Sequence, residues 1–224
     1  GQIMHGMIAG YHELGRAECL ESAIKAGYWM VNRQDADGCW RRSVHNGIPH
    51  TYNTRAAWAL LRAGLLSDEQ RLINSAVLNL HWAITQATAS GWFKENAFKT
   101  GEHPFTHTIA YAMRGLLEGG VLVNQPSLVE ATALAAQALA AEQHKDGWLT
   151  GEFDDNWQPV GRYSCLTGVA QVALNWQRLK QLGYEGEWQK HIDRAIIFLK
   201  HNHRITGEGG PLDGGIAGSA PIWG

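Results

Sequence analysis

The sequence feature that most constrains the fold is a pattern that recurs along the chain. In each copy a helical segment leads to a glutamine, a short gap, and then a glycine close to a tryptophan. The copies are Gln34, Gly38 and Trp40; Gln86, Gly91 and Trp92; and Gln143, Gly147 and Trp148, with a degenerate fourth from Phe198 through His203 into the glycine-rich stretch 207–215. The interval between copies fits one helical hairpin, a unit that cannot bury its apolar face alone. Neighbouring hairpins must therefore stack on one another.

A second class of helical segment lies between these copies. Each member opens with polar and aromatic residues and continues with small apolar ones, as in the segments that begin at His50, His107 and Tyr163. The dipeptide His-Thr recurs at 50–51 and 107–108, and Leu-Leu recurs at 60–61 and 116–117. Because alanine and glycine let helices approach closely, we assign this class to an inner layer and the more charged class to an outer layer.

These two classes predict where the helices lie. Inner helices are expected over residues 49–64, 105–119 and 163–182, with 4–14 as the remnant of another, and outer helices over 19–34, 68–86, 126–143 and 187–202. The prolines that precede or open helices are Pro49, Pro104, Pro159 and Pro126. The glycines expected to end the inner helices are Gly15, Gly64, Gly119, Gly120 and Gly183. Eight helices follow, in four inner and outer pairs.

The segment Gln34 to Trp40 resembles the QW repeat of squalene and hopene cyclases. The alternation of inner and outer helices is similar to the toroids of terpenoid cyclases and protein prenyltransferases. This resemblance implies an all-α fold, an α/α toroid or incomplete barrel of about four hairpins, as a single domain over residues 1–224. Toroids of this kind also serve glycan lyases, epimerases and hydrolases, so the fold does not fix the reaction.

The catalytic motifs of those families are matched poorly. Cyclases use an Asp-x-Asp-Asp acid, and the nearest segment here, residues 152–155, begins with Glu152 and is expected to be a solvated turn. Prenyltransferases hold zinc with an Asp-x-Cys and a later His. Asp37, Cys39 and His107 match superficially, but this Asp-x-Cys ends an outer helix rather than opening an inner one. We therefore expect no metal site and no cofactor.

Composition excludes several classes of partner. The 19 basic and 21 acidic residues are spread along the chain, so no nucleic-acid groove is expected. The longest apolar run, residues 128–139, contains polar residues and falls short of the roughly 20 residues that a membrane-spanning helix needs. No signal peptide is visible, and three widely spaced cysteines fit a reducing compartment. A cytoplasmic protein is expected.

The functional site is expected where the inner helices begin. The 10 Trp and 11 His residues suit a site that grips a polar, flat-faced ligand. Arg55 would neutralise a carboxylate, His107 would be the base, and Tyr52 or Tyr163 the acid. The residues assigned to substrate binding are His50, Trp92, Glu95, His103, Trp148, Asp154 and Trp157.

Each of these residues also has a structural interpretation. His50 and His107 could cap their helices or bond across the ring, because buried polar groups are normally paired. Arg55 could form an ordinary salt bridge, and both tyrosines could be core aromatics. Cys165 is expected to be a small buried hydrophobe. The co-location of ionisable and aromatic groups in three successive repeats favours a site.

Three functions compete at this point. The preferred hypothesis is an enzyme acting on an acidic, uronate-containing polysaccharide by lyase or epimerase chemistry. The alternatives are an isoprenoid enzyme of the terpenoid cyclase or prenyltransferase type, and a non-catalytic scaffold or glycan-binding module. We also expect the chain to be part of a longer protein, with further segments or a partner chain completing the ring.

Overall fold

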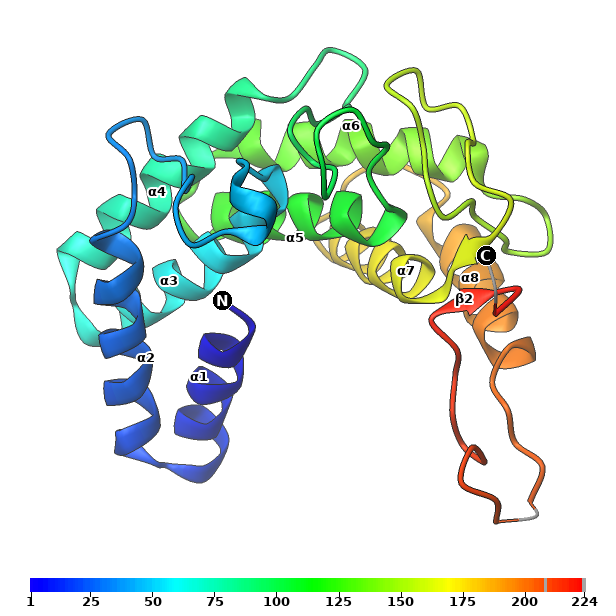
Figure 1. The fold of residues 1–224 in the computed structure, drawn as a ribbon, viewed down its shortest axis with the longest axis horizontal. Helices are drawn as coiled ribbons and strands as arrows, with labels where there is room; N and C mark the ends of the chain where they lie inside the picture. The colour runs from blue at the N-terminus through cyan, green and yellow to red at the C-terminus, as the bar shows by residue number, and fades with distance from the viewer. Residues whose placement is uncertain (208, 223–224) are drawn as a thin grey trace. The chain divides into compact units, whose positions relative to one another are not determined.

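The computed structural model describes residues 1–207 and 209–222. Within these residues the regular secondary structure is almost all helical, and long loops join several of the helices (Figure 1). The α-helices are α1 (Gln2–Leu14), α2 (Ala17–Val31), α3 (Thr54–Ser67), α4 (Gln70–Thr85), α5 (Thr106–Leu122), α6 (Pro126–Glu142), α7 (Leu166–Gln181) and α8 (Trp188–His201). Short 3-10 turns are η1 (His45–Gly47) and η2 (Thr51–Asn53), and strands β1 (Ser164–Cys165) and β2 (Ser219–Ala220) pair antiparallel. All of the predicted helices are present.

The described residues form two compact units, and each is considered by itself. The first contains Gly1–Thr88, Phe93–Glu102 and Tyr111–Thr132. The second contains Ala89–Trp92, His103–Ala110 and the chain from Ala133 onward. The division passes through α5 and α6. A single domain over residues 1–224 stays a prediction.

Consecutive helices pack as antiparallel hairpins within each unit. In the first unit α1 packs on α2 and α3 on α4; in the second unit α7 packs on α8. The contact face of α4 is an apolar stripe in which Leu72, Ala76, Leu80 and Ala83 are fully buried. These residues recur at helical spacing, so the stripe faces α3 and the opposite side of α4 faces solvent.

Three of the glycines were assigned the wrong role. Gly15 does end α1 in a left-handed conformation, with φ of 65°. However, Gly64 lies inside α3, and Gly119 and Gly120 lie inside α5. Asp68 takes the left-handed position after α3. A Cβ on Gly64 would lie 2.8 Å from Cγ1 of Ile73, and one on Gly119 would lie 2.5 Å from Cδ1 of Leu80. These glycines allow an inner helix to approach the helix packed on it and do not end it.

The glutamines of the first and third turns join successive outer helices. The Nε2 of Gln34 donates to the backbone carbonyl of Ser75 on α4 at 2.8 Å. The Nε2 of Gln143 donates to the carbonyl of His191 on α8 at 3.0 Å. The second copy departs from this, because Nε2 of Gln86 donates to the hydroxyl of Thr85. The glutamine is therefore a link between helices in two copies out of these three.

The glycine of each turn lets the loop touch the next outer helix. Gly38 and Gly147 have φ of 91° and 92°, a left-handed conformation that side chains disfavour. A Cβ on Gly38 would lie 2.3 Å from the carbonyl oxygen of Leu78, and one on Gly147 would lie 2.1 Å from that of Arg194. Backbone thus meets backbone at both positions, which holds adjacent outer helices at a fixed spacing.

Among residues 1–207 and 209–222, no helix has both the length and the apolar character needed to cross a lipid bilayer.

Candidate active site

Each inner helix begins where its first backbone N–H groups meet a neighbouring loop. Thr51 donates its N–H to the carbonyl of Glu95 at 2.7 Å, and Thr106 donates to that of Gly151 at 2.8 Å. The hydroxyl groups of Thr51 and Thr106 also donate to loop carbonyls, those of Lys94 and Thr150. By this pattern Thr51 and Thr106 are equivalent. His107 then occupies the position of Tyr52, and the alignment of His107 with His50 suggested by the repeated His-Thr dipeptide is wrong by two residues.

The starts of the inner helices also differ from the expected boundaries. Residues 49–53 and 163–165 are not α-helical, because they form η2 and the strand β1 with the segments that lead into them. His50 is extended, with φ of −137°, and Ser164 pairs with Ala220. Arg55 and His107 do lie in the first turns of α3 and α5.

In the first unit His50 and Tyr52 lie together. His50 is 1% exposed, and its ring stacks on that of Tyr52 at a centroid distance of 4.4 Å. Its Nε2 lies 2.8 Å from the carbonyl oxygen of His45, and Phe98 packs edge-on against Tyr52. Burial lowers the pKa of His50 and raises the pKa of Tyr52 to about 12. At neutral pH the imidazole is therefore uncharged and the phenol protonated.

Arg55 projects from the same part of the first unit. Its guanidinium carbon lies 4.5 Å from the ring centroid of Tyr111 on α5. Burial lowers the pKa of Arg55, and nearby Arg114 lowers it further. Arginine keeps its charge in such a site, so a half-buried cation lies on an aromatic face. Sequence reasoning missed Tyr111 and Arg114, although their spacing of three residues on one helix could have indicated a shared face.

In the second unit His107 lies beside Cys165. Its Nδ1 is 3.7 Å from the Sγ of Cys165, and its ring stacks on Phe105 at 5.6 Å. The N–H of Gly168 donates to the same sulfur at 3.3 Å, so Cys165 caps α7. Burial lowers the pKa of His107 and raises that of Cys165. The pair is thus a neutral imidazole and a thiol, and the imidazole can accept a proton.

Tyr163 has a carboxylate partner in this unit. Its hydroxyl donates to Oε1 of Glu152 at 2.7 Å. Burial raises the pKa of Tyr163, and the hydrogen bond to Glu152 raises it further. Glu152 was expected to lie in a solvated turn, and its pairing was not foreseen. Phe153 beside it is fully buried, and the Asp154 carboxylate accepts the N–H groups that close the following turn.

The residues assigned to substrate binding differ in how exposed they are. Trp92 and Trp157 meet edge to face at 5.2 Å and are each 7% exposed, so little of either ring is open to a sugar. Trp148 is half-buried against His144. Glu95 and His103 are exposed. Sugar binding by these residues stays a prediction, as does one cavity lined by His50, Tyr52, Arg55, His107 and Tyr163.

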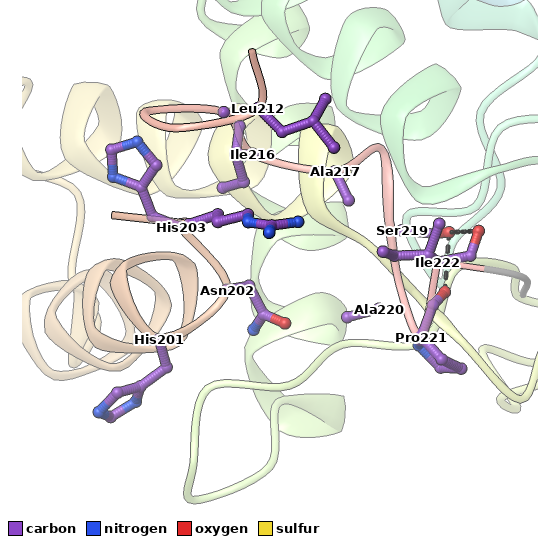
Figure 2. A pocket seen from close by; sticks show the side chains of 12 residues that line it. His201, Asn202, His203, Leu212, Ile216, Ala217, Ser219, Ala220, Pro221 and Ile222 are labelled. Atoms are coloured by element: carbon purple, nitrogen blue, oxygen red, sulfur yellow. Dashed lines mark hydrogen bonds between the residues drawn. The ribbon is translucent and has the colours of Figure 1, made fainter. Parts of the chain in front are cut away.

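A cavity of about 550 Å³ lies elsewhere in the second unit (Figure 2). It is bounded by the end of α8 and by the loop that leads to β2. Its mostly apolar lining includes Leu212, Ile216 and Ile222, with His203 at one edge. None of the residues assigned to catalysis or substrate binding lines it.

The Asp-x-Cys segment considered as a zinc site forms a turn. Asp37 accepts the N–H of Cys39 and binds Arg41 at 2.7 Å. Arg41 lowers the pKa of Asp37 to about 2, and burial raises the pKa of Cys39 to about 12. Within the described ranges, no three His, Cys, Asp or Glu side chains are grouped as metal ligands.

Comparison with known proteins identifies the fold class. No protein-family profile matches the chain, and no curated protein sequence matches it. Among solved structures it is similar to an unsaturated glucuronyl hydrolase from Bacillus sp. GL1, described as responsible for the degradation of glycosaminoglycan, with a TM-score of 0.74 at 15% identity over 92% of this chain and 62% of that one. It is also similar to a sugar epimerase from a ruminal bacterium, with a TM-score of 0.70 at 16% identity over 97% of this chain and 61% of that one.

A polysaccharide lyase is a third similar structure, with a TM-score of 0.68 at 11% identity over 96% of this chain and 61% of that one. The chain therefore has an α/α-toroid fold like that of these structures. It spans about three-fifths of the length of these structures. The toroid expected from the sequence is confirmed. These three structures are sugar-processing proteins and not terpenoid cyclases.

Proposed function

We propose that this chain is part of a carbohydrate-active toroid enzyme that acts on an acidic, uronate-containing polysaccharide by lyase or epimerase chemistry. The observation that carries the proposal is the guanidinium of Arg55, half-buried over Tyr111 at the start of an inner helix. A planar cation held in a partly desolvated site suits a carboxylate better than a neutral sugar. The glucuronyl hydrolase, lyase and epimerase named above support the substrate class.

The roles follow from the protonation states. Arg55 neutralises the uronate carboxylate, which makes the adjacent C5–H more acidic. His107 is uncharged at neutral pH and accepts that proton. In a lyase the electron pair then forms a C4=C5 bond and expels the glycosidic oxygen, which takes a proton from Tyr52 or Tyr163. In an epimerase C5 instead takes a proton on the opposite face from Tyr52 or Tyr163, and the phenolate and the protonated His107 then return to their starting states by proton exchange with solvent.

Turnover of defined glycans tests this proposal. The full chain is incubated with polygalacturonate, a glucuronate-containing polysaccharide and a neutral glucan, while ultraviolet absorbance reports new C=C bonds and solvent deuterium incorporation at C5 reports epimerisation. We expect reaction on the acidic glycans only.

Arg55→Gln should lower kcat/KM on those glycans by about 100-fold, on the scale of one lost charge-assisted contact in the transition state. The matched control is Arg71→Gln on α4, whose exposed guanidinium lies over Tyr28. Equal loss in both variants, or equal reaction with the neutral glucan, would contradict the proposal. Binding of acidic glycans without any reaction would favour the binding-module hypothesis.

An isoprenoid enzyme is the second candidate. It is favoured by the glutamine, glycine and tryptophan turns, which resemble those of cyclases. In this protein, however, Gln34 and Gly38 hold adjacent outer helices together, a task that any toroid needs. The inner helices of the first unit also carry guanidiniums where an isoprenoid site would place aliphatic and aromatic side chains.

The three cysteines are free thiols, which supports a reducing, cytoplasmic setting as part of the proposal.

A further inference from the structure

We infer that α1, α3 and α5 carry a second anion subsite, which binds a carboxylate or sulfate on a neighbouring sugar of the same glycan. The inference rests on the proposed function and narrows its substrate to glycans with at least two anionic groups. The residues that form this second subsite are His5, Trp58, Arg62, Arg114 and Glu118. None of them was assigned a role from the sequence.

Trp58 is the centre of the second subsite. The guanidinium of Arg62 lies 5.7 Å from its ring centroid, and that of Arg114 lies 5.5 Å from it. The ring of His5 meets the same indole at 4.3 Å. Three inner helices thus direct polar groups to one half-buried indole ring. An indole with cations around it can stack on a sugar ring while the cations bind that sugar's anionic group.

His5 fixes the position of Arg62. Its Nε2 lies 3.1 Å from the backbone carbonyl oxygen of Arg55, and its Nδ1 lies 3.3 Å from Nη1 of Arg62. Because a guanidinium can only donate, Nδ1 must be the acceptor and Nε2 must carry the proton. The imidazole is therefore neutral, in agreement with burial lowering its pKa to about 4. It orients Arg62 without adding charge of its own.

The charge of the second subsite is positive. Arg62 and Arg114 are both half-buried, and Arg114 is paired with Glu118 at 2.8 Å. Among the five residues of the second subsite, two guanidiniums, one carboxylate and a neutral imidazole sum to one positive charge. Such a charge is costly to bury for packing alone and is stabilised when an anion binds.

Arg62, the arginine that the second subsite places on α3, is separate from Arg55. Arg55 and Arg62 lie seven residues apart on α3 and therefore on one side of it, about 10 Å apart along the axis. One pyranose ring is shorter than the distance between Arg55 and Arg62, so its single carboxylate cannot reach both arginines. An oligosaccharide with an anionic group on each of two sugars can reach both arginines.

Calorimetric titration of the full chain tests the inference. The ligands are a digalacturonate, a sulfated uronyl disaccharide, and a disaccharide of the same length with only one uronate. We expect the two dianionic ligands to bind on the order of 10- to 100-fold more tightly than the monoanionic one, the range for a charge-assisted contact. The carboxylate and sulfate ligands show which anion is preferred.

Variants locate the effect. Arg62→Gln should remove the preference for the dianionic ligands and leave the affinity for the monoanionic disaccharide unchanged, whereas Arg71→Gln should change neither. Glu118→Gln removes a carboxylate that competes for Arg114, so it should tighten dianionic binding by several-fold, a gain that misfolding cannot imitate.

An Arg62→Gln variant that weakens all three ligands equally, or a wild-type protein without the preference, would overturn the inference even if the enzyme turns over uronate glycans. Conversely, an Arg62-dependent preference in a protein without turnover would support the subsite and count against the proposed reaction.

Discussion

The outer turns and the starts of the inner helices derive from the same repeat, yet their side chains behave differently. In the outer turns Gln34 and Gln143 make the same contact, an amide donating to a backbone carbonyl of the next outer helix. At the inner starts Arg55 lies over an aromatic ring, His107 beside a thiol and Tyr163 on a carboxylate. The first and third copies share one packing contact at the glutamine, although the second copy keeps the residue without that contact. At the inner starts both the residue and its partner change from one copy to the next.

If the outer turns are purely structural, their glycines should matter most for stability. Gly38→Ala places a Cβ against the carbonyl of Leu78 in a left-handed conformation. We expect the free energy of unfolding to fall by about 2 to 4 kcal/mol, as measured by urea denaturation. The control is Gly47→Ala, which has φ of 66° but open space around the new Cβ and should cost only the backbone strain, about 1 kcal/mol. Equal costs would show that close approach is unimportant.

The glutamine link should have the next largest effect. Gln34→Met keeps the shape of the side chain but leaves the carbonyl of Ser75 without its amide donor. We expect a loss of about 1 to 3 kcal/mol in the free energy of unfolding. Gln86→Met is the matched control, because its amide donates to the adjacent Thr85 rather than to another helix, and it should change stability by less than about 0.5 kcal/mol. A large loss in the control would mean that all three copies work alike.

The pH dependence of stability should distinguish His5 on an inner helix from Asp37 in an outer turn. We expect this effect on stability to be smaller than those of the glycine and glutamine substitutions. Burial lowers the pKa of His5 from 6.5 to about 4. Below pH 6.5 the unfolded chain takes up a proton that the folded chain refuses, so stability falls as the pH falls from 6.5 toward 4. His5→Gln should reduce this slope in thermal or denaturant unfolding.

Asp37 in an outer turn provides the contrast. Arg41 lowers its pKa from 3.8 to about 2, so its contribution is full above pH 3.8 and is lost only as the pH approaches 2. Asp37→Asn should therefore leave the slope between pH 6.5 and 4 intact. If both variants altered the same pH window, the assignment of His5 as the buried neutral group would be wrong.

Much of the fold could be predicted because its determinants are local or periodic. Apolar stripes, the proline at the start of α6 and the glycine after α1 placed the helices to within a few residues of their observed bounds. The ends of α3 and α5 were misplaced because a glycine that stops a helix and one that admits a packed neighbour look the same in a sequence. Only the structure distinguishes the two kinds of glycine, because it places Ile73 against Gly64 and Leu80 against Gly119.

The candidate site was less accessible to sequence reasoning. Arg55 and His107 stand out as charged or titratable groups at helix starts, and the structure places both in first turns. The pairing of Tyr163 with Glu152 could not be foreseen, because it joins a loop to an extended segment that no periodicity describes. The same holds for Arg62 and Arg114, which meet at Trp58 only because α3 and α5 pack side by side.

The sequence by itself determined that the chain forms helical hairpins of two classes, since helical periodicity and hairpin length are properties of consecutive residues. Only the tertiary structure decided the register between repeats. The dipeptides His50-Thr51 and His107-Thr108 suggest one alignment, but the hydrogen bonds of Thr51 and Thr106 to their neighbouring loops establish another, two residues away. The physical reason is that a helix start must satisfy its own backbone N–H groups, and which threonine does so depends on where the neighbouring loop places its carbonyls.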